Sequence, residues 1–159
     1  MRSQLFIRKA TRDDIPAIVE LNGLLAGLHT GWDDYYKSGD QTAAGFRSFL
    51  QEVMGKRDVL ILVLQTDEAL AGYFLGMIDR AKPFVKPDKV GRISDAFIRE
   101  AYRQSGWGRR MFEEMLDWFR EKGVEYLELS VDARNRQGIE AWQSFGMEPF
   151  MIKMKRKIQ

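Results

Sequence analysis

The sequence predicts a single domain, residues 1–159, of the α/β (α+β) class, in which helices flank a central sheet. Its 159 residues suffice for one compact domain with a buried core. Apolar runs of strand length alternate along the chain with longer segments whose apolar residues recur at helical spacing. The hydrophobic share of 45% and the charged share of 30% are those of an ordinary soluble globular protein.

The first third of the chain is expected to contain one strand and two helices. Residues 5–8 form the opening strand, and Thr11 can cap the helix that follows. Apolar residues at helical spacing place that helix over residues 15–28. Residues 27–45 are expected to be looser because they carry several glycines. A second amphipathic helix follows, with residues 46, 49, 50 and 53 facing inward, and ends near Gly55.

The middle of the chain is expected to contain three strands. Residues 59–64 and 70–78 form an antiparallel hairpin, because the turn-prone residues 66–68 separate two strand-sized apolar runs. The prolines in residues 83–87 mark a loop that is too short to be a linker between domains. A strand from about residue 92 to residue 99 follows this loop.

The last third is expected to contain helix, strand, helix and strand. The first of these helices carries apolar residues from 111 to 119 and ends at Gly123, which suits a left-handed cap. Residues 126–131 form a strand, and Asn135 can cap the final helix. The chain closes with a strand over residues 150–157.

Cysteine is absent and His29 is the only histidine, and these two facts exclude several kinds of chemistry. Without cysteine the protein has no thiol nucleophile, disulfide or zinc–thiolate cluster. A single histidine argues against a Ser-His-Asp hydrolase. A metal site would need carboxylates almost alone, so we expect no metal cofactor.

The sequence favours a cytoplasmic protein that does not span a membrane. The longest apolar run, residues 59–64, is far too short to cross a bilayer. Residues 1–4 contain no apolar run followed by a small-residue cleavage site, so nothing indicates secretion.

The C-terminal residues are basic, and two explanations exist for them. Lys153, Lys155, Arg156 and Lys157 could contact nucleic acid, but no aromatic–basic platform accompanies them. Their alternation with apolar residues fits a final edge strand with a charged outer face. We therefore do not expect nucleic acid as a partner.

The most informative stretch, residues 98–109, lies between a predicted strand and a predicted helix. It contains Gly106 and Gly108, flanked by Arg103 and Arg109. The first turn of a helix leaves backbone N–H groups without intrahelical partners, and these groups favour a bound phosphate. Glycine lets the backbone approach such a ligand closely. The stretch therefore predicts a turn that binds pyrophosphate.

Two common phosphate-binding motifs do not fit this turn. A Walker loop requires Gly-x-x-x-x-Gly-Lys-Ser/Thr, and the chain has no such string. The dinucleotide fingerprint requires Gly-x-Gly-x-x-Gly, whereas Gly106 and Gly108 are followed by Arg-Arg-Met. Taken alone, the two glycines are equally compatible with a plain strand-to-helix turn.

The longer string Tyr102-Arg103-x-x-Gly106-x-Gly108, after a hydrophobic strand that ends at Ile98, resembles a known signature. It is similar to the acetyl-coenzyme A motif Arg/Gln-x-x-Gly-x-Gly/Ala of the GNAT superfamily of N-acetyltransferases.

The resemblance covers nearly the whole chain. The pattern Ile-Arg-x-Ala-Thr-x-x-Asp, from Ile7 to Asp14, resembles the usual start of these enzymes. Asn135, followed by Trp142 and Gly146, resembles their second motif, in which an asparagine precedes an aromatic residue and a Gly-Phe pair. The order of the predicted elements also fits the family.

This resemblance implies a GNAT fold, with a central mixed, mostly antiparallel twisted sheet of six to seven strands, about four flanking helices, and fourth and fifth strands that splay apart. Acetyl-CoA would be the co-substrate, with its pantetheine arm in the gap. An amine would attack the thioester directly, and a backbone amide near Phe97 or Ile98 could polarise the carbonyl. The residues implied for cofactor binding are Phe97, Ile98, Arg99, Arg103, Gln104, Ser105, Gly106, Trp107, Gly108, Arg109, Asn135 and Trp142.

Two of these residues have rival roles. Helix capping is a fully adequate role for Asn135. Trp142 stands where many relatives carry a tyrosine that acts as general acid, and an indole N–H cannot release a proton at useful pH. The acid would then be Tyr102, Tyr126 or water, and we expect Trp142 to pack against the cofactor.

Asp95 is the candidate base for the proton of the attacking amine. Many relatives carry Glu-Asp on the fourth strand, where this chain has Ser94-Asp95. The carboxylate could accept the proton directly or through water. The alternative is a structural role in which it holds loop amides beside the sheet. Ser94 has no evident base that would make it a nucleophile.

The acceptor is expected to meet the segment after the first helix, with His29, Trp32, Asp33 and Tyr36 as candidate residues. Aromatic rings and carboxylates together suit a cationic amine. The alternative is that Trp32 and Tyr36 pack against the edge of the sheet, the carboxylates stay solvated, and His29 is a structural hydrogen-bonding group.

We therefore expect an N-acetyltransferase that acts on the primary amine of a small molecule, an amino acid or a peptide. A protein N-acetyltransferase is an alternative within the same fold, and it would need an open groove. A non-catalytic coenzyme A-binding sensor or interaction module is the alternative from another class, favoured by the missing tyrosine. A homodimer is one way to cover the open edges of so small a sheet.

Overall fold

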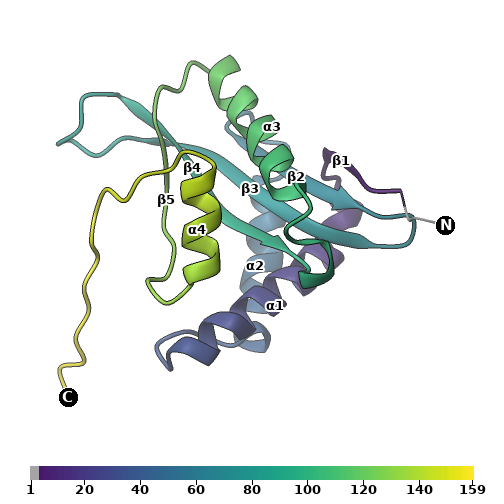
Figure 1. The fold of residues 1–159 in the computed structure, drawn as a ribbon, viewed down its shortest axis with the longest axis horizontal. Helices are drawn as coiled ribbons and strands as arrows, with labels where there is room; N and C mark the ends of the chain where they lie inside the picture. The colour runs from purple at the N-terminus through teal and green to yellow at the C-terminus, as the bar shows by residue number, and fades with distance from the viewer. Residues whose placement is uncertain (1–3) are drawn as a thin grey trace.

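The computed structural model describes residues 4–159 and is built on one five-stranded sheet with the order β1-β2-β3-β4-β5 (Figure 1). The strands are β1 (Phe6–Lys9), β2 (Val59–Gln65), β3 (Leu70–Arg80), β4 (Lys89–Ile98) and β5 (Leu127–Leu129). Adjacent strands are antiparallel except β4 and β5, which are parallel. The expected mixed, mostly antiparallel sheet is confirmed, with five strands in place of six to seven.

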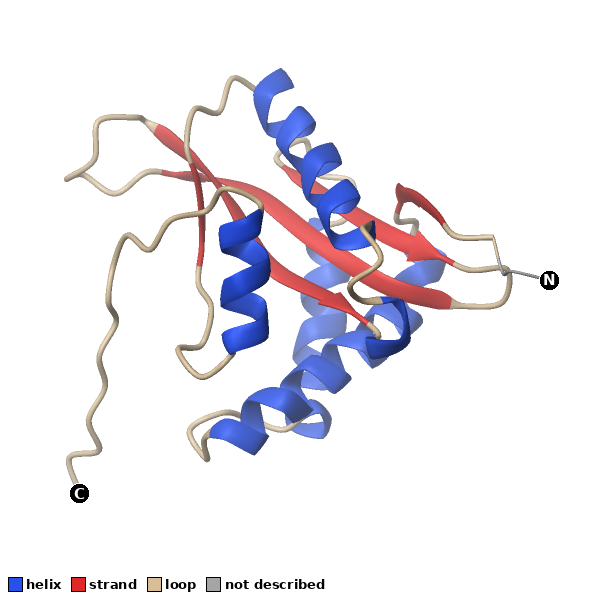
Figure 2. Cartoon of the chain, in the orientation of Figure 1, coloured by secondary structure: helices blue, strands red, loops and turns tan. Residues whose placement is uncertain are grey.

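Four helices cover the two faces of this sheet (Figure 2). On one face lie α1 (Ile15–Trp32) and α2 (Gly39–Val53), and on the other lie α3 (Trp107–Glu121) and α4 (Arg136–Ser144). The short 3-10 turns η1 (Arg12–Asp14) and η2 (Glu100–Tyr102) precede α1 and α3. No helix within residues 4–159 is both long and apolar enough to cross a membrane.

Strand β2 lies between two hydrophobic cores, which explains its uninterrupted apolar run. Ile61 and Val63 belong to the core beneath α1 and α2. Leu60, Leu62 and Leu64 belong to the core beneath α3. Successive side chains of a strand point to opposite faces, so a strand that is covered on both sides must be apolar at every position.

The segment between the first two helices is more regular than the sequence suggested. Helix α1 continues to Trp32, and α2 already begins at Gly39. Ser38 accepts a hydrogen bond from the Gln41 backbone and forms a capping box with it, a start signal that the glycine-rich composition obscured. A Cβ built on Gly39 would lie 2.9 Å from the Cα of Gly23, so the two helices approach closely because glycines stand there.

The strand expected over residues 150–157 is not formed within the chain. Residues 148–159, called the C-terminal tail below, leave the body of the domain as an extended segment (Figure 1). Within residues 4–159, no backbone hydrogen bond joins this tail to another segment. A strand requires a hydrogen-bonded neighbour, and the tail does not lie against any strand of its own sheet.

The junction of β1 with α1 depends on one ion pair. Arg8 Nη1 donates to Asp14 Oδ2 at 2.7 Å and Arg8 Nη2 donates to Asp14 Oδ1 at 2.8 Å. The Asp14 carboxylate also accepts the backbone N–H of Thr11 at 2.7 Å. The hydrogen bonds from Arg8 lower the pKa of the Asp14 carboxyl, although burial opposes this shift. The Asp14 side chain is only 11% exposed, so solvent screens the pair weakly.

We expect Asp14→Asn to lower the free energy of unfolding by about 1.5–3 kcal/mol at pH 7, because it leaves the Arg8 charge without its partner. Since the pKa of Asp14 is lowered in the fold, its contribution is present above the unfolded pKa and is lost as the pH falls through the folded pKa. Urea denaturation at pH 7 and pH 3 measures both effects. The exposed neighbour Asp13→Asn is the control, and an equal loss in both variants would contradict the assignment.

Candidate active site

Strands β4 and β5 are paired over only three residues and then separate. Gly91, Arg92 and Ile93 face residues 127–129 of β5, and no later residue of β4 has a partner there. The remaining part of β4 runs on toward α3 while β5 turns away (Figure 1). The predicted splaying of the fourth and fifth strands is confirmed.

A β-bulge lies at the point of separation. Leu75 of β3 pairs with Asp95, but the next residue, Gly76, pairs with Ile93, so Ser94 has no residue opposite it. One extra residue reverses the side to which every later residue of the strand turns. The bulge therefore sets the orientation of β4 beyond Ser94.

The bulge directs two backbone amides toward the side that β5 has left. Arg99 donates its N–H to Ala71 of β3 at 2.8 Å. Because successive residues of a strand direct their N–H and C=O groups to opposite sides, Phe97 also faces β3, whereas Ala96 and Ile98 face the gap. Phe97, Ile98 and Arg99 were expected to bind the pantetheine arm. Of these, only Ile98 directs its N–H into the gap, and the N–H of Ala96 points there too.

The turn between η2 and α3 holds six successive amide groups without an acceptor within residues 4–159. Helix α3 makes its first backbone hydrogen bond from Arg110 to Gly106, at 3.1 Å. Gln104 and Gly106 both have positive φ, 57° and 87°. Such alternation of backbone handedness gathers amides into a concave anion site. The amides belong to Gln104, Ser105, Gly106, Trp107, Gly108 and Arg109.

The two arginines of the turn also hold its surroundings in place. Arg103 donates from Nε to the Ile98 carbonyl at 2.6 Å, and its guanidinium lies 5.2 Å from the Phe97 ring centroid. Arg109 donates from Nη2 to the Ser144 carbonyl at the end of α4, at 2.9 Å. These contacts fix the turn between the end of β4 and the end of α4.

Asn135 and Trp142 have structural contacts within the chain. The Asn135 side chain accepts the Gly138 N–H at 2.9 Å and so caps α4, the rival role weighed for it. The ring of Trp142 lies 5.9 Å from those of Phe74 and Phe112, in the core on the α3 face. Trp142 therefore packs on aromatic neighbours, and its contact with a cofactor stays a prediction.

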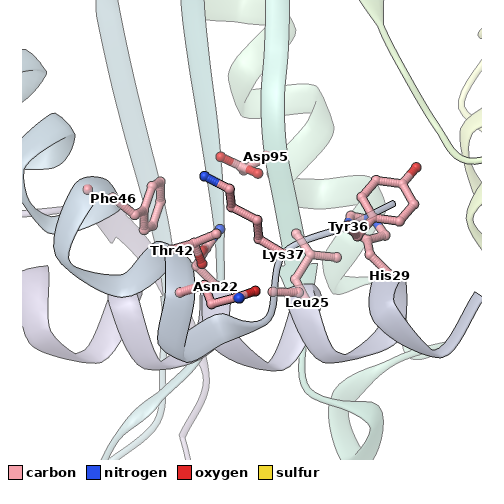
Figure 3. Close-up of a pocket in the computed structure, with 11 residues that line it drawn as sticks. Asn22, Leu25, His29, Tyr36, Lys37, Thr42, Phe46 and Asp95 are labelled. Carbon is pink, nitrogen blue, oxygen red and sulfur yellow. The ribbon is translucent and has the colours of Figure 1, made fainter. Parts of the chain in front are cut away.

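A cavity of about 480 Å³ opens between α1, α2 and β4 (Figure 3). Two of its lining residues are charged, Asp95 from β4 and Lys37 from the segment between the helices. Figure 3 shows the Lys37 side chain extending toward Asp95. The complete lining is Asn22, Leu25, Ala26, His29, Tyr36, Lys37, Gln41, Thr42, Gly45, Phe46 and Asp95. Within residues 4–159, no group of three or more His, Asp or Glu side chains could hold a metal ion.

Asp95 supplies the carboxyl among the lining residues of this cavity, and its pKa is strongly shifted. Burial raises its pKa to about 6, and the positive charge of Arg92 partly opposes that rise. Tyr73, which is completely buried, receives a hydrogen bond from Asn22 at 3.2 Å, and burial together with the negative charge of Asp95 raises the pKa of the Tyr73 hydroxyl. A carboxyl with a pKa near 6 is ionised at pH 7 and can still bind a proton readily.

His29 and Tyr36 form the aromatic wall of the cavity, and hydrogen bonds connect this wall to the loop after β5. Tyr36 donates its hydroxyl to Asp132 Oδ2 at 2.6 Å. Arg134 pairs with Asp132 at 2.9 Å and donates to the Trp32 carbonyl at 2.7 Å. These hydrogen bonds, chiefly those from Arg134, hold the pKa of the Asp132 carboxyl well below its usual range, while the bond to Asp132 raises the pKa of Tyr36. The network joins the end of α1 to the far side of the gap.

The four acceptor candidates separate into two groups. His29 and Tyr36 line the cavity, with their rings stacked at 4.8 Å. Trp32 and Asp33 do not line it. Asp33 instead accepts hydrogen bonds from Lys155, the Tyr35 backbone and Arg134, which lower its pKa to about 2. Burial lowers the pKa of His29, opposed by the charge of Asp132, so the imidazole is neutral at pH 7.

The chain belongs to the GNAT family of acetyltransferases. The family model described as "Acetyltransferase (GNAT) family" matches residues 25–147, which is more than half of the chain. The protein is thus an acyltransferase by family, as the signature turn predicted. No curated protein sequence matches the chain.

Solved structures of similar fold cover nearly the whole chain. A tetramutant of the BH1408 protein from Bacillus halodurans has a TM-score of 0.82 and 23% identity, over 96% of this chain and 99% of its own. A GCN5-related N-acetyltransferase from Ralstonia eutropha JMP134 has a TM-score of 0.81 and 17% identity, over 98% and 100%. Aminoglycoside N-acetyltransferase AAC(6')-Iy, in complex with CoA, has a TM-score of 0.77 and 16% identity, over 100% and 98%. At sequence identities this low, the structural similarity supports the fold alone.

Sequence reasoning missed the residues that complete the cavity. Lys37 lies just before α2 and Gln41 and Thr42 lie near its start, all within the stretch interpreted as loose. The Ser38 capping box was the signal that could have placed them on a helix beside the cavity. Asp132 and Arg134, which support the aromatic wall, had no local signal, because their partners lie about a hundred residues earlier in the chain.

We expect Asp95→Asn to raise the free energy of unfolding at pH 7 by about 1–3 kcal/mol, because a pKa shift of one unit corresponds to about 1.4 kcal/mol. Since the pKa of Asp95 is raised in the fold, the folded protein binds this proton more tightly than the unfolded chain. The stability cost therefore develops as the pH rises from about 4 to about 6, and well below pH 4 both states are protonated and the cost vanishes.

Urea denaturation at pH 7 and pH 4 measures this difference. The advantage of Asp95→Asn should be present at pH 7 and largely lost at pH 4. The exposed Asp88→Asn is the matched control and should change little at either pH. A variant at Asp95 that is less stable than the parent at pH 7 would mean that neighbouring groups favour the ionised carboxyl.

Proposed function

We propose that the protein transfers the acetyl group of acetyl-CoA to the primary amine of a small molecule, an amino acid or a peptide, by direct attack. The observation that carries this proposal is the placement of Asp95 in β4. Beyond the bulge its side chain faces the cavity, while the amides of Ala96 and Ile98 face the gap between β4 and β5. A carboxylate that could serve as the base and two backbone donors would thus act from the two sides of one short strand segment.

The donor site would be the gap together with the turn before α3. The six amides from Gln104 to Arg109, which have no acceptor within residues 4–159, suit the pyrophosphate of coenzyme A, with the positive end of α3 behind them. The N–H groups of Ala96 and Ile98 would receive the pantetheine arm and the thioester carbonyl oxygen. Donors aimed at that oxygen stabilise the negative charge that develops there during acyl transfer.

The acetyl transfer would need one base and no covalent intermediate. The amine nitrogen attacks the thioester carbonyl carbon, the carbon–sulfur bond breaks, and the sulfur leaves as a thiolate. The proton of the amine passes to the Asp95 carboxylate, directly or through water. A thiol has a pKa of about 8.5, so the thiolate can leave at neutral pH and take its proton from water. The tyrosine replaced by Trp142 is then dispensable.

The cavity beside Asp95 supports a small acceptor. Its volume of about 480 Å³ falls within the usual range for small-molecule sites, about 300–1,000 Å³. Lys37 and Asp95 give it one charge of each sign. An acceptor that carries an amine and a carboxylate satisfies both, whereas the Lys37 ammonium repels a polycation such as an aminoglycoside. We therefore place an amino acid first among the acceptors.

We expect Asp95→Asn to lower kcat by about 100-fold or more at saturating acetyl-CoA and to leave the affinity for CoA nearly unchanged. Release of free CoA thiol with a panel of amines measures turnover, and calorimetry measures CoA binding. Asp88→Asn is the control, because Asp88 is exposed and does not line the cavity. Tight CoA binding by the parent protein without turnover on any amine would overturn the proposed activity and favour a non-catalytic sensor.

The pH profile of kcat/KM tests the base itself. With an acceptor whose own amine pKa lies well below 6, activity should rise with pH through about 6, because the ionised Asp95 accepts the proton. This rising limb should disappear in Asp95→Asn. A rising limb that persists in the variant would assign it to another group.

We expect Lys37→Ala to raise KM about tenfold for an amino acid, the loss of an interaction worth about 1.4 kcal/mol. The matching decarboxylated amine should show no increase, because it has no carboxylate to pair with Lys37. Lys37→Arg is the control variant, since it keeps the charge. Equal changes for the two acceptors in Lys37→Ala would contradict the assignment.

A further inference from the structure

Lys37 places a primary amine in the cavity beside Asp95. It is the one lysine among the lining residues, and its side chain extends toward the Asp95 carboxylate (Figure 3). Within residues 4–159, the Lys37 ammonium forms no ion pair and no hydrogen bond, in contrast to three other lysines. The lysines that do so are Lys56, Lys89 and Lys155. The Lys37 amine is therefore available for chemistry inside the cavity.

Both sequence neighbours of Lys37 are fixed to other parts of the fold. Tyr36, before it, donates its hydroxyl to Asp132 Oδ2 at 2.6 Å. Ser38, after it, is the N-cap of α2, and its backbone N–H donates to Gln41 Oε1 at 2.9 Å. A side chain between two fixed residues has only its own rotamers to vary. The amine is thus held at the cavity by the backbone on each side of it.

The group that would accept a proton from this amine is present in the same cavity. Burial raises the pKa of Asp95 to about 6, so its carboxylate is ionised at pH 7 and can still take a proton from a neighbouring ammonium. The proposed donor site lies on the other side of the same strand segment, at the amides of Ala96 and Ile98. A primary amine beside Asp95 therefore meets the conditions proposed for the acceptor, and Lys37 carries such an amine.

We propose that Lys37 is a site of self-acetylation: with acetyl-CoA bound and no acceptor in the cavity, the protein acetylates its own Lys37 side chain. This modification rests on the proposed function, because it uses the same donor site and the same base. It adds to that function a modified residue and a second acceptor that is part of the chain. Attachment to the chain gives the amine a high effective concentration at the site, which free acceptors must match.

The transfer to Lys37 can be written with each bond and proton in place. The ammonium first gives one proton to the Asp95 carboxylate, which leaves a neutral nitrogen. This nitrogen attacks the thioester carbonyl carbon, so a carbon–nitrogen bond forms and the carbon–sulfur bond breaks. The sulfur leaves as a thiolate and takes the second nitrogen proton through water, and Asp95 then releases its proton to solvent. The products are acetylated Lys37, free CoA thiol and one proton.

Acetylation of Lys37 changes what the cavity can bind. The new amide carries no charge, so the cavity keeps the Asp95 carboxylate and loses its positive partner. The carboxylate of an amino acid then has no cation to pair with and meets a like charge at Asp95. The modified protein therefore binds amino acids less well. Self-acetylation thus slows the enzyme when acetyl-CoA is abundant and the acceptor is scarce.

Mass spectrometry after incubation with deuterated acetyl-CoA, without any added amine, tests the modification. Lys37 should gain the label at least about 100-fold faster than Lys82, an exposed lysine outside the cavity that reports uncatalysed acetylation. The rate constant should not depend on protein concentration, because the reaction takes place within one chain. Labelling of Lys37 no faster than Lys82, or a rate constant that rises with protein concentration, overturns the proposal.

Variants separate this chemistry from simple exposure of the lysine. Asp95→Asn keeps the amine and should lower the labelling of Lys37 about 100-fold or more, whereas Asp88→Asn should leave it unchanged. Lys37→Arg should remove the label from this position. Calorimetry with CoA checks that each variant still folds and binds the donor. Labelling of Lys37 at the parent rate in Asp95→Asn would show general reactivity of the lysine and overturns the proposal.

Added amines show which of the two proposals fails. In a second sample, a panel of free amines accompanies acetyl-CoA, and release of CoA thiol measures their turnover. Turnover of free amines together with an unlabelled Lys37 overturns self-acetylation and leaves the proposed function standing. The absence of both overturns both.

Discussion

The separation of β4 from β5 is the constraint on which the rest of the site depends. The two strands pair over three residues, and the bulge at Ser94 then changes which way each later residue turns. Asp95 consequently faces the α1 and α2 side, while the amides of Ala96 and Ile98 face the space that β5 has left. Without the bulge at Ser94, the Asp95 side chain would point to the opposite face of the sheet, away from the cavity. A single irregularity in one strand thus aligns a carboxylate, a row of backbone donors and the turn into α3.

The carboxylates around this separation differ in pKa because their surroundings differ. Asp132 lies in a dense set of hydrogen bonds from Arg134 and Tyr36, which favour its ionised form. Asp95 is largely buried and makes no direct ion pair within residues 4–159, so its ionised form is disfavoured. The first arrangement fixes the aromatic wall of the cavity, since it ties Tyr36 to the loop after β5. The second leaves a carboxyl that can exchange a proton near neutral pH, which is the property a general base requires.

Local features of the site could be predicted from the sequence, and long-range ones could not. The turn from Gln104 to Arg109 and the cap at Asn135 depend on residues a few positions apart, so their patterns are readable in the chain. The cavity depends on α2 lying beside β4, and its support depends on Tyr36 meeting Asp132 across 96 positions. The bulge at Ser94 exists only relative to β3, because it is a mismatch between two strands. The sequence of β4 alone therefore does not predict the bulge.

The C-terminal tail shows which features of a strand an alternating sequence pattern can predict and which it cannot. The alternation of apolar and basic residues correctly predicts an extended segment with one apolar face. A strand also needs a hydrogen-bonded neighbouring strand, and the alternation does not predict which strand that is. Lysines on an edge strand usually prevent pairing with other chains. Lys153, Lys155 and Lys157 therefore limit the indiscriminate pairing that the exposed apolar face of the tail would otherwise allow.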